Sequence, residues 1–442
     1  MQPQGAVPMD TVIVLFTRDL RVRDHPALTA ACARGGHVVP LFVLDPKVPA
    51  GRRAGFLTDC LADLRASLRA RAGDLLVRRG DTVAETMRLA AEVGASEVYA
   101  SADVSALARG RERRLAGERI GLRLFPGLTI VPPRELLPSG GGDHYRVFTP
   151  YWRAWAAHPR RPVLPAPSRV PLPPGLEHGL EPGLEHGLEP GLEPGDLPGH
   201  APHPALRGGE PAARARLELW RREGLDGYAD GHDDLAGDRT SRLSPYLRFG
   251  CLSPLEAACV APVEHPFVRQ LCWRDFFHQV TLAFPAIGRR DYRPRPRRWR
   301  DDAEAVSAWK AGMTGIPIVD AGMRQLLAEG WMHNRARMIV ADYLVNHLGV
   351  DWRVGAAHFF DLLLDGDVAD NGGNWQWIAG TGNSPRPGRV LNPLRQARRF
   401  DPVSGYIHRY VPELAGLAPA EAREPWRIGG VRGYPAPLTA PG

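Results

Sequence analysis

Short apolar runs alternate with amphipathic stretches in the first third of the chain, and this alternation predicts its elements. The β-branched, apolar runs are typical of buried parallel strands and lie at 11–16, 38–44, 75–79 and 97–101. Between the second and third runs, residues 56–72 carry leucines at helical spacing, at Leu57, Leu61, Leu64 and Leu68. Strand–helix alternation predicts a doubly wound parallel-sheet α/β domain over residues 10–135. No G-x-G-x-x-G follows the first run, so the usual dinucleotide fingerprint is absent.

The middle of the chain loses this pattern. Five tandem GLE[HP] tetrapeptides run from Gly175 to Pro194. A glycine, and often a proline, every four residues opposes both helix and strand, which predicts a flexible interdomain linker over residues 159–204. His178 and His186 within it could bind a metal, but the composition favours solvated linker histidines.

The remainder, residues 205–442, has few strand-like runs and reads as an all-α domain. It holds nine of the eleven tryptophans. Packing is the ordinary role of any one tryptophan, but this concentration suggests a further use for some of them.

Charge separates the three pieces. Residues 1–158 carry 22 basic and 16 acidic side chains, the predicted linker 3 and 6, and residues 205–442 carry 31 and 27, which gives +6, −3 and +4 within the total of +7. Of the 56 basic residues only Lys47 and Lys310 are lysines. A GC-rich genome explains most of that bias; the functional alternative is a phosphate-binding surface, since arginine offers a bidentate donor fork.

Several classes of protein are excluded. An average composition, with 44% hydrophobic and 24% charged residues, excludes a wholly disordered or fibrous chain. Five scattered cysteines without a C-x-x-C exclude a disulfide framework or a cysteine zinc site. Neither a signal peptide nor a run of 18 apolar residues is visible, so we expect a soluble, cytoplasmic protein.

TSRLSPYLRFG, residues 240–250, predicts a helix start that could hold an anion. Ser244 followed by Pro245 is typical of a cap and first helical residue. Thr240, Ser241 and Ser244 place hydroxyls before it, where free N–H groups favour a phosphate. An ordinary capped helix is the alternative.

GWMHNRARMIVADYLVNHL, residues 330–348, predicts a helix with Asn334, Arg337 and Met338 on one face, because they are spaced i, i+3, i+4. A buried Arg337 needs a carboxylate partner. A purely structural ion pair would explain Arg337 but not Asn334.

LDGDVADNGGNWQW, residues 364–377, places Asp365 and Asp367 in a glycine-rich loop before Asn371, Trp375 and Trp377. A calcium loop competes with this interpretation, but the EF-hand spacing and its final glutamate are missing, and we assign no metal.

Arginines gather in two runs, Arg289–Arg300 and Arg386–Arg399, and Gln270 and Trp273 lie one helical turn apart in FVRQLCWRDFF, residues 267–277. Arginine runs with interleaved aromatic residues fit binding to a nucleic-acid backbone, with a solvated loop as the alternative.

Together these motifs resemble the DNA photolyase/cryptochrome family, in particular its class I type cyclobutane pyrimidine dimer photolyases. FTRDLRVRDHPAL, residues 16–28, is similar to the family's opening strand and turn. TSRLSPYLRFG, WRDF, GMTGIPIVDAGMRQL, EGWMHNRARM, DGDVADNGGNWQW and RVLNP follow in the family's order. The resemblance covers nearly the whole chain outside the linker. It implies an α/β antenna domain, a linker and a helical domain that binds FAD.

The resemblance assigns residues to the cofactor. The FAD phosphates would be held by Tyr228, Thr240, Ser241, Arg242, Leu243 and Ser244. The isoalloxazine and adenosine parts would be surrounded by Asn334, Arg337, Asp365, Asp367 and Asn371. The family places Asn371 opposite the flavin N5; plant-type cryptochromes have aspartate there and animal ones cysteine, so Asn371 indicates a repair enzyme.

The same resemblance implies light-driven repair of cyclobutane pyrimidine dimers by electron transfer from reduced FAD to a flipped-out lesion, in the base-flipping group that includes photolyases. Trp273 and Trp377 would clamp the lesion, with Asn334, Met338 and Gln270 beside it. Trp375, Trp352 and Trp299 would form an electron relay to the surface. Arg335 and Arg389 match positions at DNA phosphates.

Gln270 departs from the family's cyclobutane-specific members, which usually have glutamate there. The (6-4) photolyases also have glutamine, but their two lesion-site histidines would fall at Asn334 and Met338. We therefore expect cyclobutane dimers as substrate, with a reduced quantum yield. The alternatives are (6-4) repair, a cryptochrome-type blue-light photoreceptor, and a light-independent flavoprotein oxidoreductase.

A second chromophore is also implied. ASADVSALARGRERR, residues 100–114, is more similar to deazaflavin-binding members than to folate-binding ones, with Arg53 and Asp103 as contacts or, equally, as ordinary surface charges. Damaged DNA is the expected partner of a monomer without an obligate protein partner or membrane contact.

Overall fold

The computed structural model describes residues 10–48, 50–174, 176, 206–384 and 388–440. By packing, the chain divides into two compact units. The first holds residues 1–136, 157–218 and 243–263; the second holds residues 137–156, 219–242 and 264–442. Among the described residues, no helix combines the length and the apolar character needed to cross a membrane.

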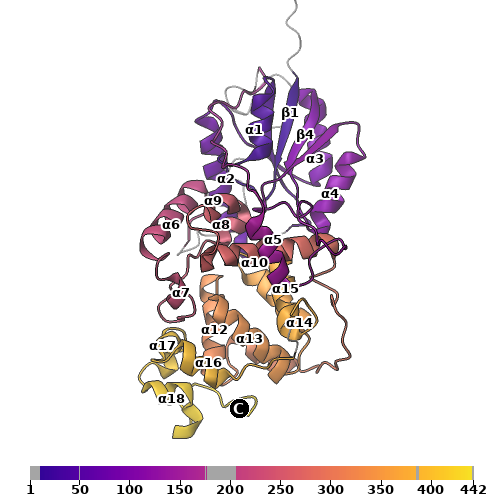
Figure 1. Cartoon of the computed structure of the whole chain (residues 1–442). Helices are drawn as coiled ribbons and strands as arrows, with labels where there is room; N and C mark the ends of the chain where they lie inside the picture. The colour runs from indigo at the N-terminus through magenta and orange to yellow at the C-terminus, as the bar shows by residue number, and fades with distance from the viewer. Residues whose placement is uncertain (1–9, 49, 175, 177–205, 385–387, 441–442) are drawn as a thin grey trace, which may run out of the picture. The chain divides into compact units, whose positions relative to one another are not determined.

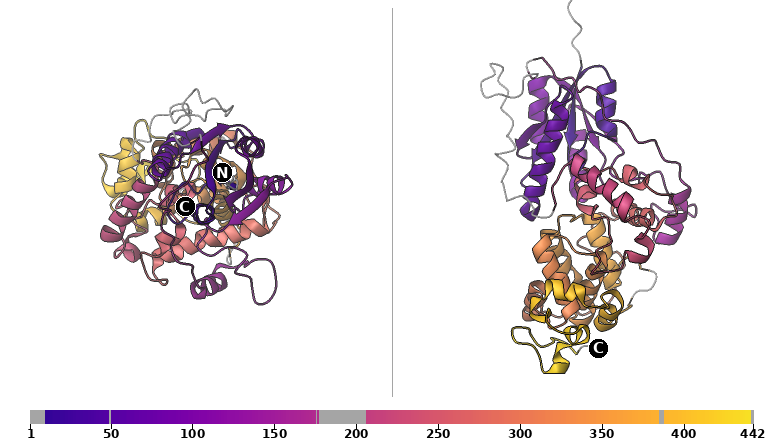
Figure 2. Two further views of the ribbon diagram at one scale, coloured as in Figure 1. Left: turned by 90° about the horizontal axis from the view of Figure 1, so that it is seen from above. Right: turned by 90° about the vertical axis from the view of Figure 1, so that its left-hand side faces the viewer.

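A five-stranded parallel sheet forms the centre of the first unit. Its strands run in the order β3-β2-β1-β4-β5 and are β1 (Thr11–Phe16), β2 (His37–Leu44), β3 (Leu76–Arg79), β4 (Ala95–Ser101) and β5 (Gly121–Phe125). Helices flank the sheet (Figures 1 and 2): α1 (Pro26–Ala33), α2 (Ala54–Arg69), α3 (Thr82–Val93) and α4 (Ala106–Ala116). β1 is buried along its whole length, as a strand with neighbours on both edges requires.

The predicted α/β fold is confirmed, with one strand more than the sequence analysis expects. The four predicted strands are present with ends shifted by one or two residues. β5 lies at the edge of the sheet, paired only to β4, and most of it is exposed or half-buried. Because an edge strand buries less, its GLRLF sequence lacks the continuous apolar run that marks the other strands.

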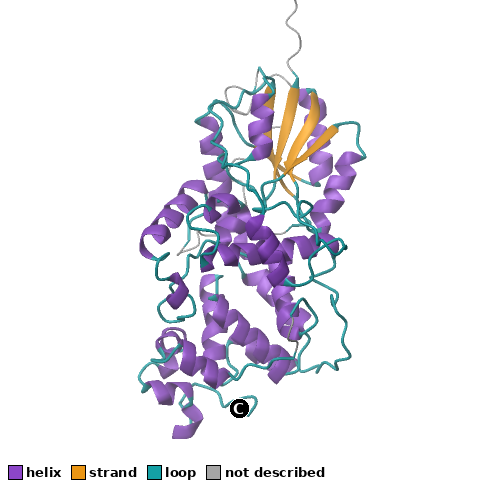
Figure 3. Ribbon diagram, in the orientation of Figure 1, coloured by secondary structure: helices purple, strands orange, loops and turns teal. Residues whose placement is uncertain are grey.

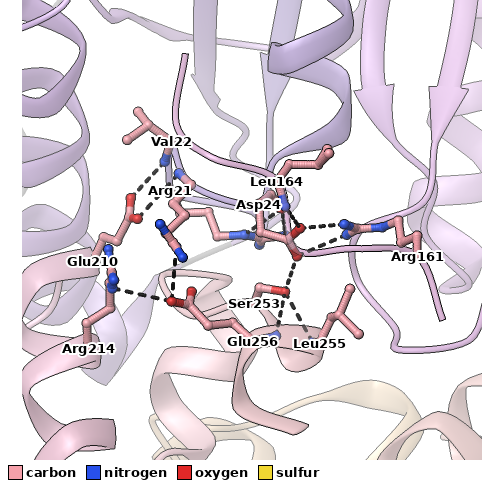
Figure 4. A network of polar contacts seen from close by, with 11 residues as sticks. Arg21, Val22, Asp24, Arg161, Leu164, Glu210, Arg214, Ser253, Leu255 and Glu256 are labelled. Carbon is pink, nitrogen blue, oxygen red and sulfur yellow. Dashed lines mark hydrogen bonds and ion pairs between the residues drawn. The ribbon is translucent and has the colours of Figure 1, made fainter. Parts of the chain in front are cut away.

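A network of buried charges ties later segments of the chain to the loop after β1 (Figure 4). Arg21, 1% exposed, donates to the carbonyl oxygens of Asp24, Gly127 and Gly250 at 2.9–3.2 Å. The Asp24 carboxylate accepts from Arg161 and from the Ser253 hydroxyl. The network therefore fixes both the loop after β1 and the start of α9 (Pro254–Ala258) within this unit.

Packing assigns some segments differently from the predicted boundaries. Val170 N donates to Arg71 O at 2.7 Å, so residues near 170 pack with the sheet rather than forming part of a free linker. α8 (Ser244–Phe249), α9 and most of α6 (Glu210–Glu223) belong to the first unit as well. Apart from Leu176, the GLE[HP] repeats with His178 and His186 lie outside the described residues, as do residues 385–387 in the second arginine run.

The second unit is helical within its described residues, as predicted, and Figure 3 shows all strands gathered in the sheet of the first unit. Its α-helices are α5 (Phe148–Ala157), α7 (Tyr228–Gly231), α10 (Pro266–Ala283), α11 (Ala303–Ala311), α12 (Pro317–Glu329), α13 (Asn334–Asp342), α14 (Trp352–Leu362), α15 (Val368–Ala379), α16 (Pro393–Phe400), α17 (Gly405–Tyr410) and α18 (Pro419–Arg423). A π-helical turn, η3 (Tyr343–His347), continues α13, and the C-terminal part adds the 3-10 turns η4 (Pro412–Leu414) and η5 (Pro425–Ile428). Its core centres on α12, α13 and α14, around Met323, Val340 and Trp352.

Candidate functional site

The polar face of α13 is arranged as the spacing predicts. Arg337 forms a bidentate pair with Asp365, at 3.1 Å for Nη1–Oδ1 and 2.8 Å for Nη2–Oδ2. Arg337 Nε also donates to Met332 O at 2.8 Å, so the guanidinium has a single orientation. Asn334, the first residue of the helix, is exposed, and its side chain makes no hydrogen bond within the described residues.

His333 caps α13 and is buried at 1% exposure. Its Nδ1 accepts from Arg335 N at 3.1 Å. Burial lowers the pKa of His333 to about 4. The ring is therefore neutral at pH 7, which is the state that can accept a hydrogen bond through Nδ1.

Asp367 and Asn371 hold the start of α15. Asp367 Oδ1 accepts from Ala369 N at 2.8 Å and from Asp370 N at 3.1 Å, as a helix cap does. Asn371 Nδ2 donates to Ala356 O at 2.8 Å. Since a carbonyl can only accept, this bond fixes the amide so that Oδ1 is directed away from Ala356. Oδ1 accepts no hydrogen bond within the described residues, so it is available to a donor N–H.

Asp365 and Asp367 lie outside the helices, in the loop that the sequence predicts, whereas the two glycines that follow belong to α15. The two glycines are explained by close packing. A Cβ at Gly372 would lie 2.9 Å from Ile287 O, and one at Gly373 would overlap the Phe277 ring. The glycines therefore let α15 approach α10 and the segment that follows it.

The predicted phosphate-binding segment divides between the units. Thr240, Ser241 and Arg242 belong to the second unit, whereas Leu243 and Ser244 begin the region assigned to the first. Ser244 is not the cap that the sequence predicts: Leu243 takes the cap position without a side-chain bond, and Ser244 is the first helical residue before Pro245.

Arg242 and Tyr228 are both held by their surroundings. The Arg242 guanidinium pairs with Asp238 at 2.6 Å and Glu329 at 2.9 Å and lies 4.2 Å from the centre of the Trp331 ring. Its φ of 51° is left-handed. Burial raises the pKa of Tyr228 to about 12, so the phenol keeps its proton as a donor. The phosphate roles of this group stay a prediction.

Two indoles meet at a right angle beside Gln270. Gln270 and Trp273 lie one turn apart on α10, and Gln270 is exposed. The ring centres of Trp273 and Trp377 are 5.2 Å apart with an interplanar angle of 90°. The structure thus brings together two aromatic residues that are far apart in the sequence, as a clamp on a planar ligand requires.

Of the three predicted relay tryptophans, two are buried and the outermost is partly exposed. Trp375 and Trp352 are 3% and 0% exposed, and Trp299 is half-buried. Trp352 Nε1 donates to Asp291 at 2.9 Å, and Arg297 lies 4.5 Å from the centre of the Trp299 ring. The ring neighbours of Trp375 include Trp309, at 6.2 Å between centres, which the sequence analysis missed. Nothing in the spacing of Trp309 distinguishes it from a core residue.

The two predicted DNA contacts differ in their surroundings. Arg389 is exposed. Arg335 is engaged by Asp233, with Nη2 2.8 and 2.6 Å from its two carboxylate oxygens, and lies 4.3 Å from the centre of the Phe400 ring. A phosphate would therefore compete with Asp233 for Arg335.

Three side chains that could ligate a metal ion lie close together near the start of α15. The ligand atoms of His278, Asp367 and Asp370 lie within 4.8 Å of one another. Asp367 already caps the helix through Oδ1. The sequence analysis assigns no metal, and that assignment stays a prediction.

In the first unit, Asp103 follows β4, where the strand order reverses beside β1. Its Oδ1 accepts from Val104 N at 2.6 Å and Ser105 N at 3.1 Å, and Oδ2 lies 3.6 Å from Arg18 Nη1. Arg53 ends the 3-10 turn η1 (Gly51–Arg53) and is 8% exposed. Ligands of doubly wound sheets bind at such a strand reversal. The chromophore contacts of Asp103 and Arg53 stay a prediction.

Comparison with known proteins identifies both units. Residues 12–171 match the family described as DNA photolyase, and residues 267–439 match the FAD binding domain of DNA photolyase. The chain is 47% identical to a deoxyribodipyrimidine photo-lyase of Streptomyces griseus, over 97% of this chain and 96% of that protein. It is 35% identical to a cryptochrome DASH of Gloeobacter violaceus, over 95% and 89% of the two chains.

Solved structures agree with this. A bacterial class III photolyase from Agrobacterium tumefaciens superposes with a TM-score of 0.89 at 32% identity, over 99% of this chain and 96% of that one. The similarity covers both units and includes proteins described as repair enzymes and as cryptochromes.

Proposed function

Because the chain belongs to the DNA photolyase/cryptochrome family, we propose that it repairs cyclobutane pyrimidine dimers in DNA by light-driven electron transfer from reduced FAD to a flipped-out lesion. The observation that carries this proposal is the right-angle pair Trp273–Trp377 beside Gln270. A flipped dimer presents two bases joined at an angle, and two perpendicular indoles can each contact one of them.

The residues of the second unit fit the flavin. Arg337, oriented by Asp365 and Met332 O, can hold a negative charge close to the ring system. Asn371 Oδ1, directed away from Ala356, can accept the hydrogen bond of a ring N–H. When bound, the reduced flavin supplies the electron that opens the cyclobutane ring.

The chain's own task is then to position the lesion and exclude water. Flipping costs a few kcal/mol of unstacking. Contacts with Trp273 and Trp377 offset part of this cost, since base–aromatic stacking contributes about 1–3 kcal/mol per base. Gln270 can hydrogen-bond a pyrimidine carbonyl, and Met338 lines the pocket without adding charge.

Three tryptophans extend from the buried interior towards the surface in this proposal. Trp375 and Trp352 are protected from water, and Trp299 is half-buried, so electrons can enter at Trp299 and move inwards. Arg389 and the run Arg289–Arg300 would contact the DNA phosphates, with Arg335 exchanging Asp233 for a phosphate.

A second chromophore would bind in the first unit at Asp103 and Arg53. The strand reversal beside Asp103 supports a planar ligand there, and the resemblance favours a deazaflavin over a folate. We also propose that the chain belongs to the class I type of the family.

The second candidate, a cryptochrome-type photoreceptor, is favoured by the cryptochrome DASH relative. Asn371 and the Trp273–Trp377 pair favour repair, and Asn334 and Met338 disfavour (6-4) products.

The test supplies reduced holoprotein with oligonucleotides that contain either one cyclobutane dimer or one (6-4) product, illuminated separately. We expect pyrimidine absorbance to recover with the dimer alone. Repair of the (6-4) product alone, or no recovery with either, would contradict the proposal.

A further inference from the structure

Phe148 lies flat against the proposed lesion-binding indole. It is the first residue of α5 and is 4% exposed. Its ring centre is 3.5 Å from that of Trp273, and the planes differ by 4°. One face of Trp273 is therefore taken by Phe148, so that a base can approach only its other face or its edge.

Arg269 meets the same ring from the same helix as Trp273. Arg269 and Trp273 are spaced i, i+4 on α10, which places their side chains on one face. The Arg269 guanidinium carbon lies 5.6 Å from the centre of Phe148 and 5.7 Å from that of Trp152. Phe148 thus packs against three side chains of α10, namely Trp273, Arg269 and Phe276, and one of them is cationic.

The segment that carries Phe148 is anchored to α10 at two further points. Gln279 accepts from Tyr145 N and donates to Tyr145 O, both at 2.8 Å. Trp155 Nε1 donates to the buried Asp275 at 2.9 Å. Figure 1 shows α5 beside α10. In the sequence, the anchor residues Tyr145 and Trp155 lie on either side of Phe148.

The anchors explain why Phe148 and Trp273 stack face to face, an arrangement that free aromatic rings disfavour. Aromatic pairs prefer offset or edge-to-face geometry over a face-to-face sandwich. Since Tyr145 and Trp155 fix the segment, Phe148 has little freedom to slide. The indole plane of Trp273, and its angle to Trp377, are fixed with it.

We propose that Phe148, supported by Arg269, is a positioning residue that fixes the plane of Trp273 and thereby sets discrimination between damaged and undamaged DNA. The inference rests on the proposed lesion-binding role of Trp273. Phe148 does not touch the lesion; it determines which face of the indole is offered and at what angle.

The test compares Phe148→Leu with Phe148→Tyr, which keeps the ring, in the FAD-loaded protein. Affinity is measured for single-stranded oligonucleotides with and without one cyclobutane dimer. We expect Phe148→Leu to weaken dimer binding about tenfold, the scale of one lost stacking contact, with little effect on undamaged DNA. Phe148→Tyr restores the discrimination. FAD content and flavin photoreduction stay at the wild-type level.

Thr149→Ala is the matched control, because Thr149 is exposed and follows Phe148 on the same helix. It leaves discrimination unchanged. If wild-type protein does not discriminate, the proposed function itself fails. If wild type does and Phe148→Leu still does, or if Phe148→Leu loses affinity for both DNAs together, the positioning role is wrong.

Discussion

In the first unit, the buried charged side chains of Arg21 and Asp24 form their hydrogen bonds within the protein. In the second unit, some polar side chains hydrogen-bond the protein through only one of their polar groups, or through none. Arg21 and Asp24 are enclosed by carbonyls, a guanidinium and a hydroxyl. Asn371 donates to Ala356 O but has its Oδ1 directed elsewhere, and Asn334 is exposed without a hydrogen bond in the described chain. A closed network stabilises a fold, whereas polar atoms without a partner in the protein are available to a ligand.

The largest expected effect tests the closed side of this comparison. Arg21→Met leaves the carbonyl oxygens of Asp24, Gly127 and Gly250 without this donor, and should lower the free energy of unfolding by about 3–5 kcal/mol, since each unsatisfied buried acceptor costs about 1–3 kcal/mol. Urea denaturation measures it. Arg79→Met, at an exposed position, is the control and should stay close to wild type.

The next largest effect is expected at the proposed lesion-binding pair, Trp273 and Trp377. Trp377→Leu removes the indole perpendicular to Trp273 and should reduce the preference for dimer-containing DNA about tenfold. Binding titrations with matched oligonucleotides measure this, and Trp426→Leu, a half-buried tryptophan near the C-terminus, is the control. Equal preference in Trp377→Leu and wild type would mean that the indole pair is only packing.

A smaller effect is expected at Asn371. Asn371→Leu removes the amide that Ala356 O orients, and should weaken FAD binding to the apoprotein about tenfold, the scale of one hydrogen bond to a buried group. Fluorescence titration measures it. Asn374→Leu is the matched control on the same helix, because Asn374 is exposed and bonds only to Asp370 O. Similar losses in both variants would remove the special role of Asn371.

The smallest effect at neutral pH concerns His333. Its pKa is about 4 in the folded chain against an ordinary value of 6.5, so the unfolded chain binds the proton first as pH falls. The stability that neutral His333 contributes is complete above about pH 6.5 and decreases by about 1.4 kcal/mol per pH unit down to about pH 4. His358, lowered to about 4 by burial, adds a similar slope.

Unfolding curves at several pH values measure this. His333→Asn keeps a side chain able to cap α13 and should remove about half of the slope due to these two histidines. An unchanged slope would show that folding does not lower the pKa of His333.

The local sequence pattern predicted the α/β domain and the helical domain. The features that it did not predict depend on contacts between residues far apart in the sequence. The buried strands and the need of Arg337 for a carboxylate partner could be predicted, because apolar runs and an arginine on an apolar helix face each have one common solution. That the partner is Asp365 depends on the fold. β5 was missed because an edge strand has no continuous apolar run. The role of the glycines of α15 could not be predicted, because they meet Ile287 and Phe277, which only the fold brings near.

Phe148 illustrates the same limit. In the sequence it belongs to none of the predicted motifs and lies 125 positions from Trp273. Its stacking on Trp273 depends on Gln279 and Asp275, which anchor its segment to α10. One amino-acid sequence by itself contains no local signal for such a contact.

The central claim is that the open polar atoms and the indole pair of the second unit serve light-driven repair of a dimer. The most direct measurement is recovered pyrimidine absorbance per photon absorbed, in reduced holoprotein saturated with dimer-containing DNA. We predict recovery in wild type, and we expect Trp377→Leu at equal FAD content to need about tenfold more dimer-containing DNA to reach saturation. No recovery in wild type, with FAD reduced and the dimer bound, would contradict the account.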